Sequence, residues 1–438
     1  MASRVKLIRT VEFGRLSQKN LAQSIFGRLL SQRSENWSFM PRKSQIRLMF
    51  TSRWIRWALF RHLFQWAPGL ARTFNFPLQA SLARDFADEV LEDEQEDLAF
   101  AAEDLERAKA VLLPAMTNDH GVTSTYPSGR SPLRSQLLRI HHCTVLGHTL
   151  SLVDKTGAMR LGLYAGPSNW NASKPRLLKQ REAPTVSLFV LTCNGHFYHL
   201  FANDIIPLLT FLRRRGADMG PVHIVTRPDF PPFVRDTLNA LCAAYKNLHI
   251  LQLDKTERIV DASALWLSRY AETREWLPVT RAEADELSEI LSAHHQLKAP
   301  GPSDRRLFVS RGGARLRSLK NEEELKPALT KRDFEWFTPR ADDHRSQIEA
   351  FRSAGIVVTV HGAALTNLLF CRPGTLVVEL FPSNHIKSTY CWLAMRLGLR
   401  YRPVIGSVGD YLQGFTVDVN DVLAQVESEI ESGNSASP

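Results

Sequence analysis

Short apolar runs alternate regularly with helical segments from residue 184 onward, and this alternation constrains the fold more than any other feature. Apolar runs at Val186–Leu191, Val222–Thr226 and His249–Leu253 are separated by a helical pattern over His199–Arg215 and by a proline-opened helix. Strands that alternate with helices predict a parallel sheet with crossover connections. We therefore expect an α/β fold.

A proline- and glycine-rich linker at Lys298–Ser303 divides this pattern into two halves. Before it, Thr280 and Glu283 have the spacing of a capping box for a helix that ends near His295. After it we expect strands at Leu307–Ser310, Ile356–Val360, Leu376–Phe381 and Leu399–Val404, a helix capped by Asp342 or Asp343, and a closing helix over Asp418–Glu431. The sequence predicts two Rossmann-like, doubly wound halves, 184–299 and 303–438, whose ligands bind at the carboxyl ends of the strands.

The positive charge of the chain is concentrated in residues 1–80. This basic segment holds fourteen Lys or Arg and two acids, a net charge of +12, while the rest of the chain carries −2. A uniformly basic nucleic-acid binder would look different, so no nucleic acid is expected as a partner. The mixture of aromatic and cationic residues in Ser52–Phe64 is typical of a helix on an anionic membrane surface. The alternative is a helix packed on the body.

No run of eighteen apolar residues and no secretory apolar core occurs, so no transmembrane helix is predicted. The five scattered cysteines fit a reducing compartment. The expected location is the cytoplasm, peripheral to a membrane if the basic segment binds one. Organelle targeting by the arginine-rich start is the alternative.

Residues 81–183 have a different composition from the rest. Asp85–Glu106 is strongly acidic, and Leu91, Leu98 and Leu105 recur every seven residues, which predicts an exposed helix with a narrow apolar seam. Its acids either face solvent or pair with the basic segment. Residues 115–180 are predicted to be irregular, with short strands at Ser151–Val153 and Met159–Leu163.

The stretch Ile356–Phe370 predicts a phosphate site. A strand ends at Val360 and a helix follows the small turn His361-Gly362-Ala363-Ala364. Small side chains let the backbone approach a ligand closely, and the free amides of a first helical turn attract an anion. His361 could donate to a phosphate oxygen. The alternative is plain packing.

Two further stretches support a ligand site. Arg311 and Arg317 lie in a glycine-containing loop just beyond a strand, and guanidinium groups suit a diphosphate because each binds two oxygens at once. Glu379 falls within the apolar strand Leu376–Phe381. There it could accept from ribose hydroxyls or form a buried ion pair with an arginine.

The order of these motifs resembles the catalytic domain of glycosyltransferase family 61. The matching residues are Ser310-Arg311, Arg317 with Asn321-Glu322, Gln347, His361 to Asn367, and Glu379. The resemblance implies a GT-B fold and an inverting transfer of a sugar from a nucleotide-sugar, expected to be a UDP-sugar, to the hydroxyl of a glycan or other acceptor. It implies that the donor is bound by Ser310, Arg311, Arg317, Asn321, Glu322, His361, Gly362, Ala363, Ala364, Thr366, Asn367 and Glu379.

The resemblance extends upstream to His196-Phe197-Tyr198-His199 and Asp204, with about one extra residue before Asp204. An inverting displacement needs a general base, and Asp204, His199 and His196 are the candidates. The family needs no bound metal, and the chain has no Asp-x-Asp triplet, so neither metal nor cofactor is expected. A role in surface polysaccharide synthesis is our interpretation.

Two other functions fit the pattern. One is a different nucleotide- or phosphate-dependent enzyme on the same fold, such as an epimerase or a phosphate-ester hydrolase, because fold alone does not decide function. The other is a non-enzymatic protein that binds RNA or membrane through the basic segment. The cations lie outside the α/β body, which makes that segment an accessory.

Overall fold

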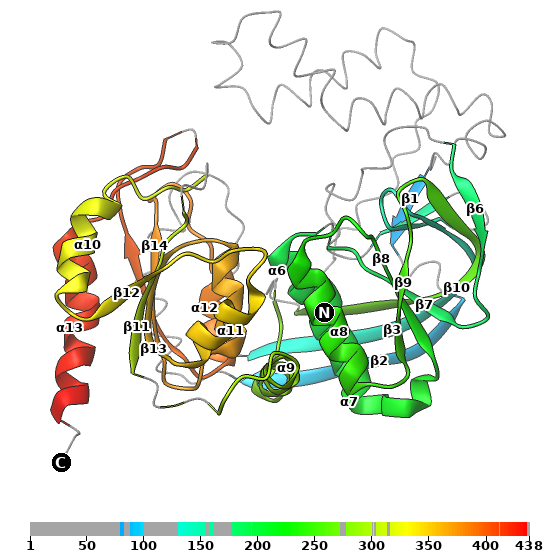
Figure 1. The fold of residues 1–438 in the computed structure, drawn as a ribbon, viewed down its shortest axis with the longest axis horizontal. Helices are drawn as coiled ribbons and strands as arrows, with labels where there is room; N and C mark the ends of the chain where they lie inside the picture. Colours follow the sequence, from blue (N-terminus) through cyan, green and yellow to red (C-terminus); the bar gives the residue numbers. More distant parts are fainter. Residues whose placement is uncertain are drawn as a thin grey trace, which may run out of the picture.

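The computed structural model describes residues 79–82, 88–99, 130–153, 158–161, 177–193, 195–271, 277–299, 301, 304–312, 316–410 and 412–435. They form two lobes, each built on its own sheet (Figure 1). The basic segment 1–80 lies almost wholly outside these residues, so its membrane-surface role stays a prediction. Among the described residues, no helix has both the length and the apolar character needed to cross a bilayer.

The C-terminal lobe contains a parallel sheet with the strand order β12-β11-β13-β14-β15. Its strands are β11 (Arg305–Val309), β12 (Phe334–Phe337), β13 (Ala354–Val360), β14 (Leu376–Phe381) and β15 (Arg400–Ile405). The order is doubly wound, and the winding reverses between β11 and β13. Ligands of such sheets bind at this switch point, beyond the carboxyl ends of the two strands.

Helices cover both faces of this sheet. They are α10 (Glu322–Thr330), α11 (His344–Arg352), η5 (Ala363–Phe370), α12 (Thr389–Arg396) and α13 (Val419–Ser435). Leu307 and Val357 pack in the core under α11, η5 and α12, while Phe308 and Val358 pack in the core under α10 and α13. Successive side chains of a strand point to opposite faces, so both faces are apolar and each strand is a continuous apolar run.

The N-terminal lobe contains a mixed sheet with the strand order β1-β5-β4-β3-β10-β7-β8-β9, in which β2 also pairs with β3 and β6 with β10. Its strands are β1 (Gln79–Leu82), β2 (Glu89–Ala99), β3 (Arg130–Leu146), β4 (Ser151–Val153), β5 (Ala158–Leu161), β6 (Lys179–Glu182), β7 (Ser187–Val190), β8 (Val222–Thr226), β9 (Leu248–Gln252) and β10 (Glu257–Ala271). β7, β8 and β9 form the predicted parallel unit. The strands from 79–182 complete the same sheet, so that region is not separate from the lobe.

The acidic stretch is a strand, and the prediction of a helix there is wrong. β2 runs antiparallel to β3, and acidic side chains of β2 pair with arginines. Arg134 Nε donates to Asp93 at 2.6 Å, and Arg139 Nη1 donates to Glu89 at 3.0 Å. Opposite charges on neighbouring strands stabilise the pairing. Residues 85–87 and 100–106 of the stretch lie outside the described residues.

The remaining helices lie in the N-terminal lobe and at the junction between the lobes. They are α6 (Phe197–His199), η3 (Leu200–Ile205), α7 (Ile206–Arg215), η4 (Gly216–Met219), α8 (Pro232–Ala244) and α9 (Arg281–His294). The capping box predicted for α9 is confirmed: Glu283 N donates to Thr280 Oγ1, and Thr280 N donates to Glu283. Glu283 also forms a buried ion pair with Arg269 at 3.1 Å.

The two lobes share one hydrophobic core. A single cluster of buried side chains includes Leu188 of β7, Leu287 of α9 and Val357 of β13. α9 packs against α8 of its own lobe and η5 of the other, and α11 and α12 face α6 and α8 across the junction (Figure 1). The linker at 298–303 therefore joins halves that are packed together, which fixes the loops of one lobe opposite those of the other.

Candidate functional site

The candidate site lies at the switch point of the C-terminal sheet. Ser310 and Arg311 follow β11, and His361 and Gly362 follow β13. Here a cavity of about 230 Å³ opens between the lobes. Its wall includes Arg311, Ala363 and Ala364 from the C-terminal lobe, and Phe197 of α6 and Phe233 of α8 from the N-terminal lobe. Both lobes thus contribute to one ligand-sized space.

Arg311 lies directly over Gly362. Its Nη1 donates to the carbonyl oxygen of His361 at 3.1 Å, and its Nε is buried without a hydrogen-bond partner. A Cβ atom placed on Gly362 would lie 1.8 Å from Arg311 Nη1. The backbone of Gly362 is extended, with φ at 169°, so any residue could adopt its conformation. Glycine is therefore needed here for space, to leave room for the guanidinium.

Arg317 and Lys387 join Arg311 in a cluster of cations. Arg317 Nη1 lies 3.5 Å from His385 Nε2, and Arg317 Nε is buried without a partner. Burial lowers the pKa of all three side chains, and Arg317 lowers the pKa of Arg311 and Lys387 further. Among the described residues, no carboxylate lies within 4 Å of these charged groups. Two half-buried guanidiniums beside an exposed lysine, without counter-ions among the described residues, favour an anionic ligand.

His361, Glu379 and Tyr401 form a buried hydrogen-bonded chain. His361 Nδ1 lies 2.5 Å from Glu379 Oε1, and Tyr401 donates to Glu379 Oε2 at 2.5 Å. Glu379 has no exposed surface, and both its oxygens are bound. The predicted contact with ribose hydroxyls is therefore wrong, and so is the alternative ion pair with arginine. Glu379 instead positions His361.

The pairing occupies His361 Nδ1 and leaves Nε2 as the ring nitrogen outside the bond to Glu379, on a side chain that is 4% exposed. Burial raises the pKa of Glu379 to about 8, and burial together with Arg317 lowers the pKa of His361. Two tightly coupled groups titrate as a pair. While the pair is neutral overall, Nε2 carries a hydrogen whether the bridging proton lies on Glu379 or on Nδ1. His361 could then donate to an anion, and its contact with a phosphate oxygen stays a prediction.

Because the pKa of Glu379 is raised, we expect the free energy of unfolding to fall as the pH rises from 6.5 to about 8. Its folded pKa is about 8 and its ordinary value is 4.5, so across this range the folded protein keeps a proton that the unfolded chain has lost. His361 has the opposite effect only below its ordinary pKa of 6.5. The contribution of Glu379 from pH 6.5 to 8 is about 2 kcal/mol, at 1.36 kcal/mol per pKa unit.

Glu379→Gln should remove this loss, since glutamine keeps both hydrogen bonds and does not titrate. Urea unfolding at pH 6.5 and pH 8 measures the difference from the wild type. Glu335→Gln is the control, because the hydrogen bond from Arg305 lowers the pKa of Glu335 and places its titration below this range. Parallel pH curves for the wild type and Glu379→Gln would show that the carboxyl is already ionised.

Several motif residues hold the site in place, and one of them, Ser310, also lines the cavity. Ser310 Oγ donates to Glu322 at 2.7 Å, and Trp336 Nε1 donates to the same carboxylate at 3.0 Å. Asn321 pairs with both backbone groups of Val417. These bonds fix the loop after β11 to α10 and to the segment before α13. The structure gives Asn321 and Glu322 a supporting place, and their contact with the donor stays a prediction.

The turn after β13 is held in the same way. The helix that follows it is a 3₁₀-helix, η5, rather than an α-helix. Thr366 and Asn367 are fully buried, and Asn367 Nδ2 donates to Gln347 Oε1 at 3.1 Å. Direct donor contacts by Thr366 and Asn367 are therefore wrong predictions. Ala363 and Ala364 do line the cavity, and their small side chains leave it open.

A π-helical turn lies between His199 and α7. η3 spans Leu200–Ile205, and a π-turn accommodates one more residue than an α-helical turn. This accounts for the extra residue before Asp204. The Asp204 carboxylate is fully buried and accepts from the backbone and side chain of Thr192 at 2.8 and 2.9 Å. Burial raises its pKa to about 7.

The two histidine candidates for the base are accessible. His196 and His199 are exposed, and their ring centroids lie 5.9 Å apart. Tyr198 lies between them in the sequence, and its ring centroid is 6.1 Å from that of Tyr390. The ring centroid of Tyr390 is in turn 5.4 Å from that of His361. This line of rings connects α6 with the turn after β13. Of the three candidates, His196 and His199 can meet a ligand directly, whereas Asp204 has no exposed surface.

Sequence reasoning missed several residues of the site. Tyr390 and Tyr401 were not singled out, and neither were His385 and Lys387 just after β14. The signal for the last two was available, because polar residues that follow a buried strand of a parallel sheet lie at its ligand-binding edge. Tyr401 gave no such signal, since it pairs with Glu379 from within the neighbouring strand.

Comparison with known proteins bears on the same region. The model of a family described as Glycosyltransferase 61 matches residues 195–378, which include every predicted site residue except Glu379. A relative from Oryza sativa subsp. japonica, "Beta-1,2-xylosyltransferease XAX1", is 25% identical over 258 residues. The match covers 54% of this chain and 43% of that protein, so the chain spans less than half the length of the relative. The resemblance inferred from the motifs is confirmed for this span.

Proposed function

We propose that this chain, in which residues 195–378 form a domain of the Glycosyltransferase 61 family, transfers a sugar from a nucleotide-sugar to an acceptor hydroxyl. One observation carries the proposal. Arg311 and Arg317 lie half-buried at the switch point with the exposed Lys387 beside them, and in the described part of the chain no carboxylate pairs with these three cations. A diphosphate supplies the missing negative charge and matches the bidentate geometry of the two guanidiniums.

The same cations account for how the diphosphate could leave. Negative charge grows on the leaving diphosphate as the bond to the sugar breaks. The unpartnered Nε atoms of Arg311 and Arg317 and the Nε2 hydrogen of His361 are donors held in place before the reaction. Donors fixed in advance stabilise developing charge without reorganisation. With no Asp-x-Asp triplet in the chain, we propose that these groups replace a metal at the diphosphate.

We place the acceptor on the side of the N-terminal lobe, in the GT-B arrangement. An inverting displacement requires the acceptor and its general base to lie opposite the leaving group. His199 is the first candidate for the base, since it is exposed and belongs to the lobe opposite the cations. Partial desolvation of the ring and the neighbouring His196 lower its pKa, which keeps the imidazole neutral and able to accept a proton. His196 is the second candidate.

The donor to test first is UDP-xylose. The name of the rice relative describes transfer of xylose, and we extend that substrate to this chain as part of the proposal. The acceptor is proposed to be a glycan hydroxyl in polysaccharide synthesis. The flat apolar surfaces of Phe197 and Phe233 on the wall of the cavity suit the face of a sugar ring.

A thermal-shift screen tests the proposal. A ligand that binds only the folded state adds about 2.7 kcal/mol of stability at 100 times its dissociation constant. We expect UDP-xylose and UDP to raise the melting temperature more than the GDP- and CMP-sugars do, and UDP-xylose to release UDP when acceptor is present. Added Mg²⁺ or Mn²⁺ should leave turnover unchanged. Failure of every nucleotide-sugar to shift the melting temperature would contradict the proposal.

A further inference from the structure

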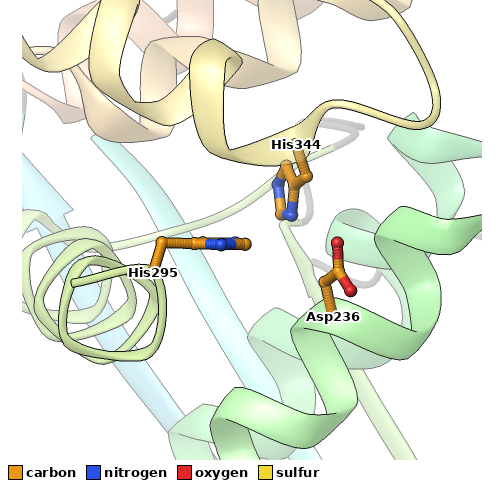
Figure 2. A group of neighbouring side chains, drawn as sticks. All are labelled: Asp236, His295 and His344. Carbon is orange, nitrogen blue, oxygen red and sulfur yellow. The ribbon is translucent and has the colours of Figure 1, made fainter. Parts of the chain in front are cut away.

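Three potential metal ligands meet behind the donor cavity. Asp236 lies on α8, His295 follows the last residue of α9, and His344 begins α11. One ligand atom from each residue lies within 4.8 Å of the other two. Figure 2 shows the two imidazoles and the carboxylate pointing toward a common centre from three separate helical segments.

The two histidines of this group lack hydrogen-bond partners. His344 is only 1% exposed, yet neither of its ring nitrogens has a partner. His295 Nε2 is also buried without one. The rings of Phe197 and Phe370 pack against His344, but they offer its nitrogens no hydrogen bond. A buried polar atom without a hydrogen-bond partner lowers the stability of the folded state by about 1–3 kcal/mol. We therefore expect these nitrogens to have a partner.

We propose that Asp236, His295 and His344 bind a divalent transition-metal ion, with Zn²⁺ the best match to the ligand set. Two imidazole nitrogens and one carboxylate oxygen are ligands that Zn²⁺ accepts, with water in the fourth position. Zinc–nitrogen bonds of about 2.0–2.1 Å place tetrahedral ligands roughly 3.4 Å apart. The three ligand atoms lie within 4.8 Å of one another, so binding an ion would draw them closer together. Asp236 and His295 are half-buried, which leaves a path for the ion from solvent.

Histidine binds metals in its neutral form. Burial, with the nearby His295 and His294, lowers the pKa of His344 to about 3, so its imidazole is neutral at physiological pH. Burial also lowers the pKa of His295. Both ligands are therefore available without loss of a proton, and Asp236 supplies the negative charge that offsets part of the ion's charge.

The ion would join the two lobes beside the cavity. α8 and α9 belong to the N-terminal lobe and α11 to the C-terminal lobe. Phe233 lies one turn before Asp236 on α8, Gln347 lies one turn after His344 on α11, and both line the cavity. This metal would hold the walls of the cavity at a fixed separation. Its place is distinct from the cation cluster at the switch point, and it takes no part there.

The metal content of the full-length protein tests the site directly. We expect about one Zn²⁺ per chain after purification without chelator, and a lower melting temperature once the metal is stripped with dipicolinate. Zn²⁺ alone should restore the melting temperature, and Mg²⁺ should not, because ligand binding stabilises only the state that holds the site. Co²⁺ added to the stripped protein should give visible absorption bands. Less than about 0.1 Zn²⁺ per chain, together with no Co²⁺ bands, would overturn the proposal.

Variants locate the ion at these residues. Asp236→Asn and His295→Gln should each weaken Zn²⁺ binding at least tenfold, and both change half-buried positions that tolerate substitution better than His344. His294→Gln is the matched control, since His294 is the exposed neighbour of His295 and lies outside the group. Equal loss of Zn²⁺ binding in His294→Gln and His295→Gln would reject the assignment. Because these readouts are metal content and spectra, they stand apart from any test of sugar transfer.

Discussion

Arg311→Ala is expected to lower the turnover number for sugar transfer about 100-fold or more, while the free energy of unfolding changes little. Losing one preorganised donor to a developing oxyanion costs about 10²–10³ in rate. The guanidinium makes one hydrogen bond to the described protein, from Nη1 to the carbonyl oxygen of His361, and its Nε has none. Most of its donors are therefore available to the ligand, so the fold depends little on them.

Arg305→Ala is the control for this experiment. Arg305 begins the same strand, β11, at the end far from the cavity, and its guanidinium is bound to Glu335. Its loss should leave turnover unchanged. Arg311→Lys separates charge from shape, because lysine keeps the charge but cannot bind two oxygens in a fork. We expect Arg311→Lys to recover only part of the rate. A normal turnover number in Arg311→Ala would remove Arg311 from the donor site.

The C-terminal lobe could be predicted from the sequence because its signals are local. Strands of a parallel sheet are covered on both faces, so each reads as an uninterrupted apolar run bounded by turn residues. β14 coincides with the predicted Leu376–Phe381, and Asp343 caps α11 with its side chain as expected. β12 was missed, since Phe334–Phe337 includes a charged residue and is only four residues long.

The N-terminal sheet could not be predicted because its stability comes from distant partners. The local sequence of β2 predicts a solvated helix. The segment is a strand because Arg134, 41 residues away from Asp93, lies beside it in the folded protein. β3 lay in the region predicted to be irregular, and its pairing with β10 joins residues that are more than a hundred positions apart. Such pairs leave no trace in local periodicity, because tertiary contacts override the local preference.

In the candidate site, too, local signals could be predicted from the sequence and contacts between distant residues could not. The sequence placed Ser310-Arg311 and His361 at strand ends, since that depends only on where each strand stops. It could not separate residues that face the cavity from those that support it. Asn321 is a supporting residue because it meets the backbone of Val417, which lies 96 residues further along the chain. The metal ligands proposed above come from three separate segments and share no motif spacing.

Gly362→Val is expected to reduce turnover about 100- to 1000-fold, as much as the loss of Arg311 itself. The added Cβ would occupy the space of the Arg311 Nη1 atom, 1.8 Å away, and the two methyl groups of valine enlarge the clash. The guanidinium must then leave its place over the turn. The backbone of Gly362 is extended, so the substitution adds no conformational strain and the protein should still fold. Steady-state kinetics and thermal unfolding measure the two effects separately.

A double variant decides how Gly362 acts. If valine works by displacing Arg311, then Gly362→Val combined with Arg311→Ala should be no slower than either single variant, since both remove the same interaction. Gly301→Val is the matched control, because a Cβ on Gly301 would meet nothing within 4 Å and turnover should be normal. Effects that multiply in the double variant would contradict displacement of Arg311. They would mean that valine blocks a second contact, and the donor phosphates are the partner that the sequence predicts for this turn.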